Sequence, residues 1–445
     1  MKISFKNVIK NLSNIDIKNK KVLAIATSSV AIVLVAVIVI TSIVSANGVT
    51  TKNGDLMKGI GGARVKNAKV TDGFSDVYAN FCLNLLANTD KDKNVAFAPT
   101  NIMSAVAFLS HASNSNAKLE VEKFFGMETI ELAKQISSIE NRIQYNEKKK
   151  TGLSFSNNIL MNNSIVYRVK KKFLKDNAKY FGLGVDRVSF ADKKALKEVF
   201  ENYTKDANYF SEIHYNVDKL QYMNVLSNTG FSAEWEEQTS LEDTTNSIFQ
   251  GSKYSTETTF FKFMTDSFIE GGVYKGFTKK LKGNFTFVGL LPNEQSDGVY
   301  YGADMILTEL SETGQFKNIT ATADDDSEVA VWLPRYSNNG TATKTVSFTT
   351  AINNMGIRTI FEKDAGFDNM ADVSSNLHVS EFAASGNIAL SPAGACDELS
   401  GNVKSQAEKL EKCNNLLLFD HEFVYFIIDD KTGLPVYCAI LRTLD

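Results

Sequence analysis

The C-terminal stretch from Leu377 to Asp445 constrains the fold most, because it places a long polar segment between two apolar strand patterns. Residues 377–390 include alternating apolar and polar side chains, which predict a β-strand. This pattern ends at the turn-forming sequence Ser391-Pro-Ala-Gly394. From Gly394 to Asn415 the side chains are small, polar or charged, so this segment is predicted to be a mobile loop in solvent.

After this loop the sequence predicts a buried β-hairpin. Two apolar runs, Leu416–Ile428 and Val436–Leu441, flank the polar turn Asp429-Asp-Lys-Thr-Gly433. A long exposed loop between a strand and a buried hairpin is presented to other molecules. The layout is therefore typical of an exposed segment that a partner protein recognises.

Other motifs lie upstream in a fixed order. They are Asn94-Val-Ala-Phe-Ala-Pro-Thr-Asn-Ile102, Ser227-Asn-Thr-Gly-Phe-Ser-Ala-Glu-Trp235, Gly276-Phe-Thr-Lys-Lys-Leu281, Phe287-Val-Gly-Leu-Leu-Pro292, Val331-Trp-Leu-Pro-Arg-Tyr336, Met355-Gly-Ile357 and Phe367-Asp-Asn-Met370. Together with the C-terminal loop and hairpin, they resemble the serpin family of serine protease inhibitors. The resemblance is to a bacterial-type serpin with an N-terminal membrane anchor. The resemblance covers about residues 72–445.

The resemblance implies an α+β fold. Helices in the first third surround a large central mixed or antiparallel sheet, and the loop at about 394–415 is an exposed reactive-centre loop. It also implies that the protein is not an enzyme but a suicide substrate for a serine or cysteine protease. The protease cuts the loop and forms an acyl-enzyme, and the loop then inserts into the sheet as a new strand.

The hinge that starts this insertion departs from the family pattern. Setting Gly394 on the family's hinge glycine makes Ala395, Cys396 and Asp397 the next hinge residues, followed by Glu398. In this register Asp397 enters an apolar layer on insertion, where an unpaired charge costs on the order of 3 to 5 kcal/mol. The alternative is therefore a non-inhibitory serpin that acts as a surface binding or structural module.

Counting along the loop places the scissile bond between about Glu408 and Lys412. Lys409 and Lys412 would suit a trypsin-like protease, whose carboxylate-lined pocket pairs with an ammonium group. Alternatively, these lysines only keep the loop soluble.

The resemblance also assigns residues beneath the opening of the sheet, called the shutter, and at its upper end, called the breach. Asn101 and Ala98 replace two shutter serines, Ser227 replaces an asparagine and Ala384 replaces a histidine. Asn101 and Ser227 can rebuild part of the polar network. Trp235 is retained in the breach and is expected to pack where the loop begins to insert.

The four cysteines show no metal-ligand spacing. Cys396 and Cys413 bracket the loop, so they form either a disulfide that staples it or two exposed thiols. Cys82 and Cys438 lie in apolar segments and are predicted to be buried thiols.

The N-terminus predicts a membrane segment. A basic cytoplasmic tail, residues 1–21, precedes the charge-free apolar run 22–46, which is long enough to span a bilayer. The run is an uncleaved anchor or a signal cleaved after Ala46. Residues 47–71 are predicted to be a flexible linker, and 72–445 form one extracytoplasmic domain, which would be secreted if cleavage occurred.

Composition excludes several other functions. The net charge is −3 and there is no extended basic patch, so the sequence predicts no nucleic-acid partner. The four histidines have no metal-ligand spacing, and no nucleophile motif is present, so no catalytic residue, metal or cofactor is predicted. The expected partners are a protease and, through residues 22–46, a membrane, and the protein is expected to be a monomer.

Overall fold

The computed structural model describes residues 48–49, 54–65, 70–163, 167–204, 222–322, 328–337, 345–373, 376–396 and 403–444. The chain divides into two units, residues 1–50 and 51–445, and the fold below is that of the second. The predicted tail and membrane segment, residues 1–46, lie outside the described residues. Within the described ranges, no helix combines the length and apolarity needed to cross a bilayer.

Helices dominate the first third of this unit, as predicted, and others follow further along the chain. They are α3 (Asp72–Ala87), α4 (Pro99–Ala112), α5 (Asn116–Phe125), α6 (Thr129–Ile143), α7 (Lys171–Asp176), η1 (Asn177–Phe181), α8 (Lys193–Thr204), α10 (Ala303–Thr313), η2 (Gln315–Thr322), α11 (Thr349–Asn354), η3 (Thr359–Phe361), η4 (Phe367–Asn369) and α12 (Ala407–Lys412). Local sequence sets their starts. Thr71 caps α3 by accepting a hydrogen bond from the Phe74 amide, and Pro99 occupies the first turn of α4, where its missing N–H costs nothing.

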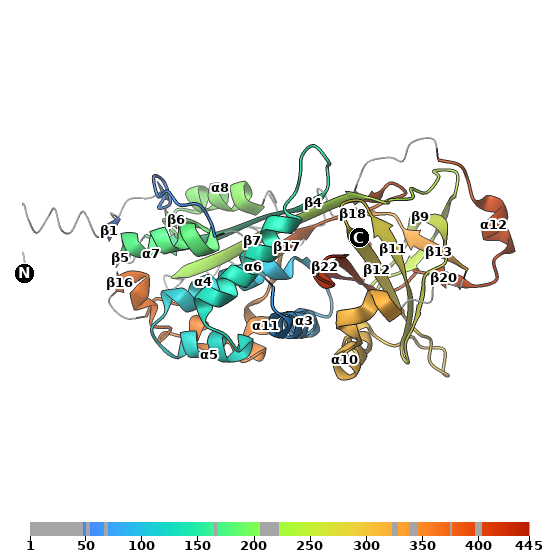
Figure 1. The fold of residues 1–445 in the computed structure, drawn as a ribbon. Helices are drawn as coiled ribbons and strands as arrows, with labels where there is room; N and C mark the ends of the chain where they lie inside the picture. The colour runs from blue at the N-terminus through green and yellow to red at the C-terminus, as the bar shows by residue number, and fades with distance from the viewer. Residues whose placement is uncertain are drawn as a thin grey trace, which may run out of the picture. The chain divides into compact units, whose positions relative to one another are not determined.

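A large mixed sheet, here called sheet A, runs through the molecule. Its strands are, in order across the sheet, β15 (Val346–Ser347), β17 (Val379–Asn387), β7 (Met223–Glu234), β4 (Gly152–Asn162), β6 (Gly184–Val188) and β2 (Gly54–Asp55). Strands β7 and β17 are parallel and pair directly, from Val379 opposite Met223 to Asn387 opposite Gly230. Helix α8 lies on one face of the sheet and α4 on the other (Figure 1). The predicted α+β class and large mixed sheet are confirmed.

Two further sheets complete the core. Sheet B has the order β10 (Phe268–Glu270), β11 (Tyr274–Leu281), β12 (Phe285–Pro292), β21 (Phe423–Asp429), β22 (Leu434–Leu441) and β3 (Val95–Phe97). Sheet C has the order β20 (Leu416–Leu418), β13 (Val329–Pro334), β9 (Ser255–Thr265) and β8 (Thr244–Gln250). Every residue of β12, β21 and β22 is buried, so the predicted apolar C-terminal hairpin forms the centre of sheet B.

Short strands complete the list of elements. They are β5 (Tyr167–Lys170), β14 (Tyr336–Ser337), β16 (Ala371–Val373), β18 (Ala389–Leu390) and β19 (Gly394–Ala395), and the first unit contains β1 (Gly48–Val49). Strand β16 pairs antiparallel with β5, and β14 pairs antiparallel with β18.

Residues 54–65 differ from the predicted linker of residues 47–71. Strand β2 extends the edge of sheet A, and the Leu56 side chain is buried with its amide donating to the Val185 carbonyl. Arg64 reaches the buried carboxylate of Glu140 on α6 at 2.5 Å. The glycines of this segment suggested flexibility, but Gly62 lies against Ala178, where little space remains for a larger side chain. The segment is therefore part of the domain.

Candidate functional site: a surface loop beside an open sheet edge

The segment after β17 folds back onto sheet A. Strand β17 pairs with β7 only as far as Asn387, and the chain turns at Ser391–Gly394. Gly394 and Ala395 then form β19, antiparallel to β7 and opposite Glu234 and Ala233. The start of the loop thus pairs with the edge of β7, beyond the point where β17 has separated from that edge.

The loop was predicted to lie in solvent from Gly394 onward, and the structure corrects its first three positions. Gly394, Ala395 and Cys396 are all buried. Small side chains are typical of an exposed turn, but they are equally suited to a narrow space between strands. Asp397, the last predicted hinge residue, lies outside the described residues.

Gly394 is required by the close approach of β7. A Cβ atom at this position would lie 2.3 Å from the Ala233 carbonyl oxygen and 2.6 Å from the Glu234 Cα atom. Both are backbone atoms, which cannot move aside cheaply. Glycine at position 394 therefore allows the loop to begin a strand here.

Trp235 holds the turn from below. Its indole N–H donates to the Ser391 carbonyl at 3.1 Å, and its backbone N–H donates to the Ala393 carbonyl at 2.8 Å. The fully buried ring packs edge-on against Phe287 of sheet B, with ring centroids 5.5 Å apart. The structure therefore places Trp235 against the turn that leads into β19.

Lys279 on β11 covers this aromatic cluster and was not identified from the sequence. Its ammonium lies 4.6 Å from the centroid of Phe263 and 5.7 Å from that of Trp235. Burial lowers the pKa of Lys279 to about 8, although the nearby carboxylates of Glu237 and Asp266 act in the opposite direction. A single lysine in an amphipathic strand gives no sequence signal for such an environment.

The predicted shutter residues come together beneath the β7–β17 pair. The side-chain amide of Asn101 donates to Ser227 Oγ at 2.7 Å, and it also lies 3.2 Å from the Ser156 carbonyl oxygen and 3.3 Å from that of Asn228. Ala384 is buried on β17 opposite Ser227. Asn101 thus joins α4 to two strands of sheet A.

Strands β7 and β17 are also joined directly by side chains. Asn228 Oδ1 accepts hydrogen bonds from Ser385 Oγ at 2.9 Å and from the side-chain amide of Asn387 at 3.2 Å. Thr229 Oγ1 donates to the Ser385 carbonyl. These hydrogen bonds must break before another strand can enter between the two.

Replacing Asn101 with alanine is expected to lower the free energy of unfolding by about 1 to 3 kcal/mol, because it leaves buried acceptors without their donor. Urea unfolding of the variant measures this loss. Asn141→Ala is the matched control: Asn141 is exposed on α6, so its replacement is expected to change stability by less than about 0.5 kcal/mol. Equal stability of the two variants would show that the network contributes little.

The described part of the loop resumes at Val403 and is fastened to sheet C. Ser405 Oγ donates to Asp243 Oδ1, the Gln406 amide donates to Asp243 Oδ2 at 2.7 Å, and Gln406 Oε1 accepts from the Met264 amide at 3.0 Å. Asp243, just before β8, is only 3% exposed. None of these contacts was predicted, because Asp243 stands in an ordinary polar turn sequence.

The other end of the loop is fastened to β13. Cys413 Sγ lies 3.7 Å from the Glu328 carbonyl oxygen, the Asn415 carbonyl accepts from the Ala330 amide at 2.9 Å, and β20 then pairs parallel to β13. Between the two attachments lies only α12, Ala407–Lys412, which has no buried residue.

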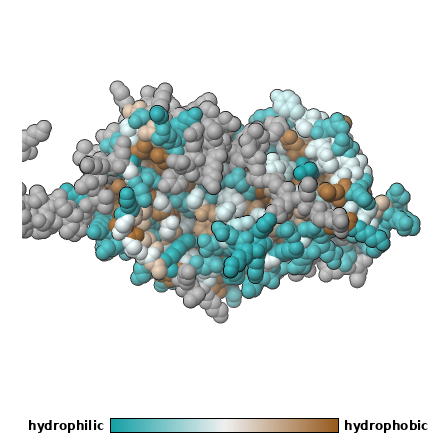
Figure 2. Space-filling model, turned by 90° about the horizontal axis from the view of Figure 1, so that it is seen from above, coloured by the Kyte–Doolittle hydropathy of each residue, from teal (hydrophilic) through white to brown (hydrophobic). Residues whose placement is uncertain are grey.

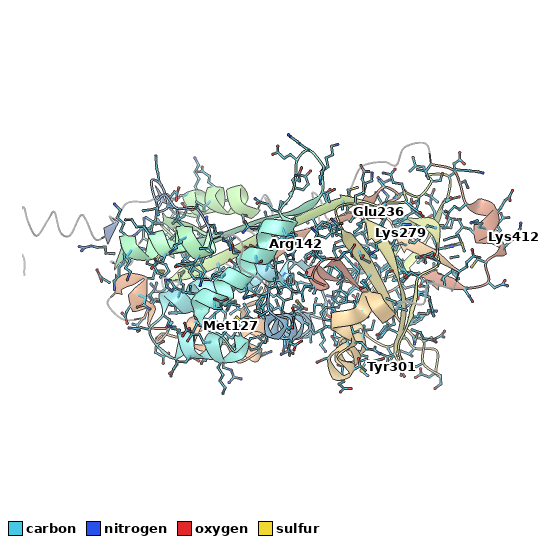
Figure 3. The ribbon with its side chains drawn as sticks, in the orientation of Figure 1. Met127, Arg142, Glu236, Lys279, Tyr301 and Lys412 are labelled. Carbon is cyan, nitrogen blue, oxygen red and sulfur yellow. The ribbon has the colours of Figure 1, made fainter. Side chains whose placement is uncertain are left out.

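Helix α12 lies at one end of the domain (Figure 1), where the visible surface is mainly hydrophilic (Figure 2). The predicted scissile residues Glu408, Lys409 and Lys412 all belong to this helix. Lys412 points away from the body, as Figure 3 shows. The predicted scissile segment is therefore exposed, but it is helical rather than extended.

All four cysteines are free thiols. Cys396 and Cys413 therefore form no disulfide with each other in this structure. Cys396 is buried rather than exposed, and Cys413 is partly exposed. Cys82 and Cys438 are buried, as predicted, and burial together with the Cys438 thiol raises the pKa of Cys82. Within the described ranges, no group of three or more His, Cys, Asp or Glu side chains could hold a metal ion.

Comparison with known proteins identifies relatives of this domain. The sequence model of the family Serpin (serine protease inhibitor) matches residues 76–442. Serpin A3-7 of Bos taurus is 25% identical over 324 residues, 68% of this chain and 73% of the bovine protein. Human alpha-1-antichymotrypsin is 24% identical over 168 residues, 36% of this chain, so the match spans only 39% of that relative's length.

Solved structures share the fold. The thermophilic serpin tengpin in its native state superposes with a TM-score of 0.74 at 20% identity, over 88% of this chain and all of tengpin. Tengpin in its latent state gives a TM-score of 0.67. Human thyroxine-binding globulin, solved in complex with thyroxine, gives 0.67 at 16% identity, over 84% of this chain and all of that one.

Proposed function

Because this chain belongs to the serpin family, we propose that helix α12 is a protease bait whose cleavage releases the loop to enter sheet A between β7 and β17. One observation carries the proposal. Gly394 and Ala395 already pair antiparallel with β7 where β17 has separated from it, so the first residues of an added strand are in place. The remainder of the loop would follow in the same register.

In the proposed reaction the protease supplies the chemistry and this chain supplies the substrate. The protease nucleophile forms an ester or thioester bond to the carbonyl carbon of Lys409, and the peptide bond to Leu410 breaks, its nitrogen taking a proton as it leaves. Residues 396–409 then carry the acylated protease as they enter the sheet. Trapping requires insertion to be faster than hydrolysis of the acyl bond.

The fastenings of the loop favour Lys409 over Lys412 as the cleaved residue. A protease cleft holds residues on both sides of the scissile bond. If Lys412 were cleaved, the residues after the bond would be Cys413 to Asn415, which are bound to Glu328 and Ala330 of sheet C. With Lys409, the residues after the bond are Leu410 to Lys412, all in the exposed helix.

Replacing Lys409 with alanine is therefore expected to abolish tryptic cleavage within α12, because the ammonium that enters the carboxylate-lined pocket is lost. Lys412→Ala is the matched control from the same helix and is expected to be cut at the wild-type rate. Mass spectrometry of the fragments after brief digestion measures both. Cleavage after Lys412 in the Lys409→Ala variant, at an undiminished rate, would contradict the assignment.

A second candidate function is non-inhibitory, with the domain serving as a binding or structural module at a surface. The hinge residue Asp397 supports it, because a carboxylate slows entry into an apolar layer. Thyroxine-binding globulin shows that this fold also occurs in a protein that binds a small molecule. Incubating the full chain with trypsin separates the candidates: an SDS-stable adduct indicates inhibition, and a large rise in melting temperature alone indicates insertion without trapping. If neither the adduct nor the rise in melting temperature is seen, the binding role is supported.

We further propose that the domain is displayed outside the cytoplasm on a membrane tether. The basic tail and the apolar run at 22–46 support this arrangement. Membrane fractionation and digestion of intact cells with an external protease test it. Recovery of the domain in the cytosolic fraction, resistant to that protease, would exclude the tether.

A further inference from the structure

We propose that Asp243 is a latch that holds the bait in a helical form which a protease cannot cut, and that Ser405 and Gln406 must leave Asp243 before cleavage. The inference rests on the proposed function, since it concerns access to the same bait. It adds a positioning residue on sheet C, outside the loop, that controls how fast the bait becomes available.

The contacts of Asp243 connect the body of sheet C to the start of α12. Its carboxylate accepts from Ser405 Oγ and from the Gln406 amide, and Ser405 Oγ in turn accepts from the Ala407 amide, the first of the helix. The backbone of Asp243 is itself fixed, because its carbonyl accepts from the Lys262 amide at 2.8 Å. A buried carboxylate with two donors thus fixes the residues that precede the helix.

Sheet C has a place for the latched segment. Strand β8 begins at Thr244, opposite Phe261, so it does not cover the end of β9. There the Met264 amide donates to Gln406 Oε1 instead of to a neighbouring strand. The loop therefore completes hydrogen bonding at the end of β9, and its departure leaves both the Asp243 carboxylate and the Met264 amide without these partners.

The latched form has the wrong shape for a protease. A protease binds its substrate extended, through backbone groups that are already used inside a helix. The six residues of α12 span about 9 Å as a helix but about 20 Å when extended. An extended segment needs its two ends to move apart. Because Cys413 and Asn415 are held at one end by Glu328 and Ala330, this movement requires release of Ser405 and Gln406 at the other end.

The same contacts oppose insertion after cleavage. The ladder places Gly394 opposite Glu234 and Ala395 opposite Ala233. Continued residue by residue, this register places Ser405 opposite Met223, at the far end of β7. Full insertion therefore carries Ser405 from sheet C along the whole of sheet A, which is impossible while it remains bonded to Asp243.

The test compares tryptic cleavage after Lys409 in the full chain and in Asp243→Asn, Ser405→Ala and Glu242→Ala variants. Glu242→Ala is the matched control, because Glu242 is the exposed neighbour of Asp243 and its carboxylate has no hydrogen bond to the loop within the described residues. Asp243→Asn weakens both hydrogen bonds while keeping the side-chain shape, and Ser405→Ala guards against a folding defect at the buried Asp243. Hydrogen exchange of the α12 amides is measured in parallel.

Cleavage after Lys409 is expected to be about tenfold faster in Asp243→Asn and in Ser405→Ala, equivalent to about 1.4 kcal/mol, with faster exchange in α12. Glu242→Ala is expected to match wild type. Equal cleavage rates in all four proteins would overturn the latch while leaving the bait intact. Absence of any cut between Gln406 and Cys413, in every protein, would overturn the proposed function and the latch with it.

Discussion

Replacing Asp397 with alanine is expected to speed insertion of the cleaved loop about a hundredfold. Continued by two residues, the register of β19 on β7 would place Asp397 opposite Phe231 in the inserted strand. Phe231 is buried and packs against Phe285 of sheet B, with ring centroids 5.2 Å apart. Directly opposed residues share a face, so the carboxylate would enter this apolar layer. If about 3 of the 3 to 5 kcal/mol for an unpaired buried charge falls in the barrier, the rate changes by two factors of ten.

The measurement follows the high-melting form after tryptic cleavage of the full chain, together with the fraction of trypsin in an SDS-stable adduct. Glu398→Ala provides the control, because residue 398 would face Gly230 on the outer side of the sheet, where a charge remains solvated. Only Asp397→Ala is expected to insert faster and trap more enzyme. Equal rates for both variants would show that the hinge charge does not limit insertion.

The sequence predicted the scaffold of the site better than the state of the loop. The apolar hairpin at 423–441 and the motif near Ser227 fix which strands form the sheets, because burial of those side chains permits few alternatives. The contact between Asn101 and Ser227, proposed from the changes at two positions, is present at 2.7 Å. These features depend on local pattern or on one pair of residues.

The helix in the loop and its attachment to Asp243 differ in how far the sequence could predict them. The segment Ala407–Lys412 consists of good helix formers, with Glu408 and Lys412 at helical spacing, so its helicity had a sequence signal. The latch had none, because Asp243 is distant in sequence and resembles any turn aspartate. Burial of Gly394 and Ala395 was missed for another reason: small residues suit both an exposed turn and a tight space beside a strand.

Residues 54–65 show a similar limit of sequence-based prediction, because composition assigned them to a linker. Their contact with α6 leads to the second prediction, which concerns the pH dependence of stability. Arg64, assigned to a linker by composition, lies 2.5 Å from Glu140, whose side chain is 2% exposed. Burial raises the pKa of Glu140 to about 7 from 4.5, although the Arg64 guanidinium acts to lower it. The folded protein therefore holds this proton more tightly than the unfolded chain does. Its contribution to stability is complete below about pH 4.5 and is lost as the pH rises through about 7.

We therefore expect wild type to lose about 3 kcal/mol more stability than Glu140→Gln between pH 5 and pH 8, since a shift of about 2.5 units at 1.36 kcal/mol each gives this value. Glutamine stays neutral, so the variant lacks this part of the pH dependence. Urea unfolding of both proteins at a series of pH values measures the difference, and Glu131→Gln, an exposed position on the same helix, is expected to follow wild type. Parallel profiles for wild type and Glu140→Gln would mean that Arg64 keeps the carboxylate ionised, and that the N-terminal segment is joined to the domain by a true ion pair.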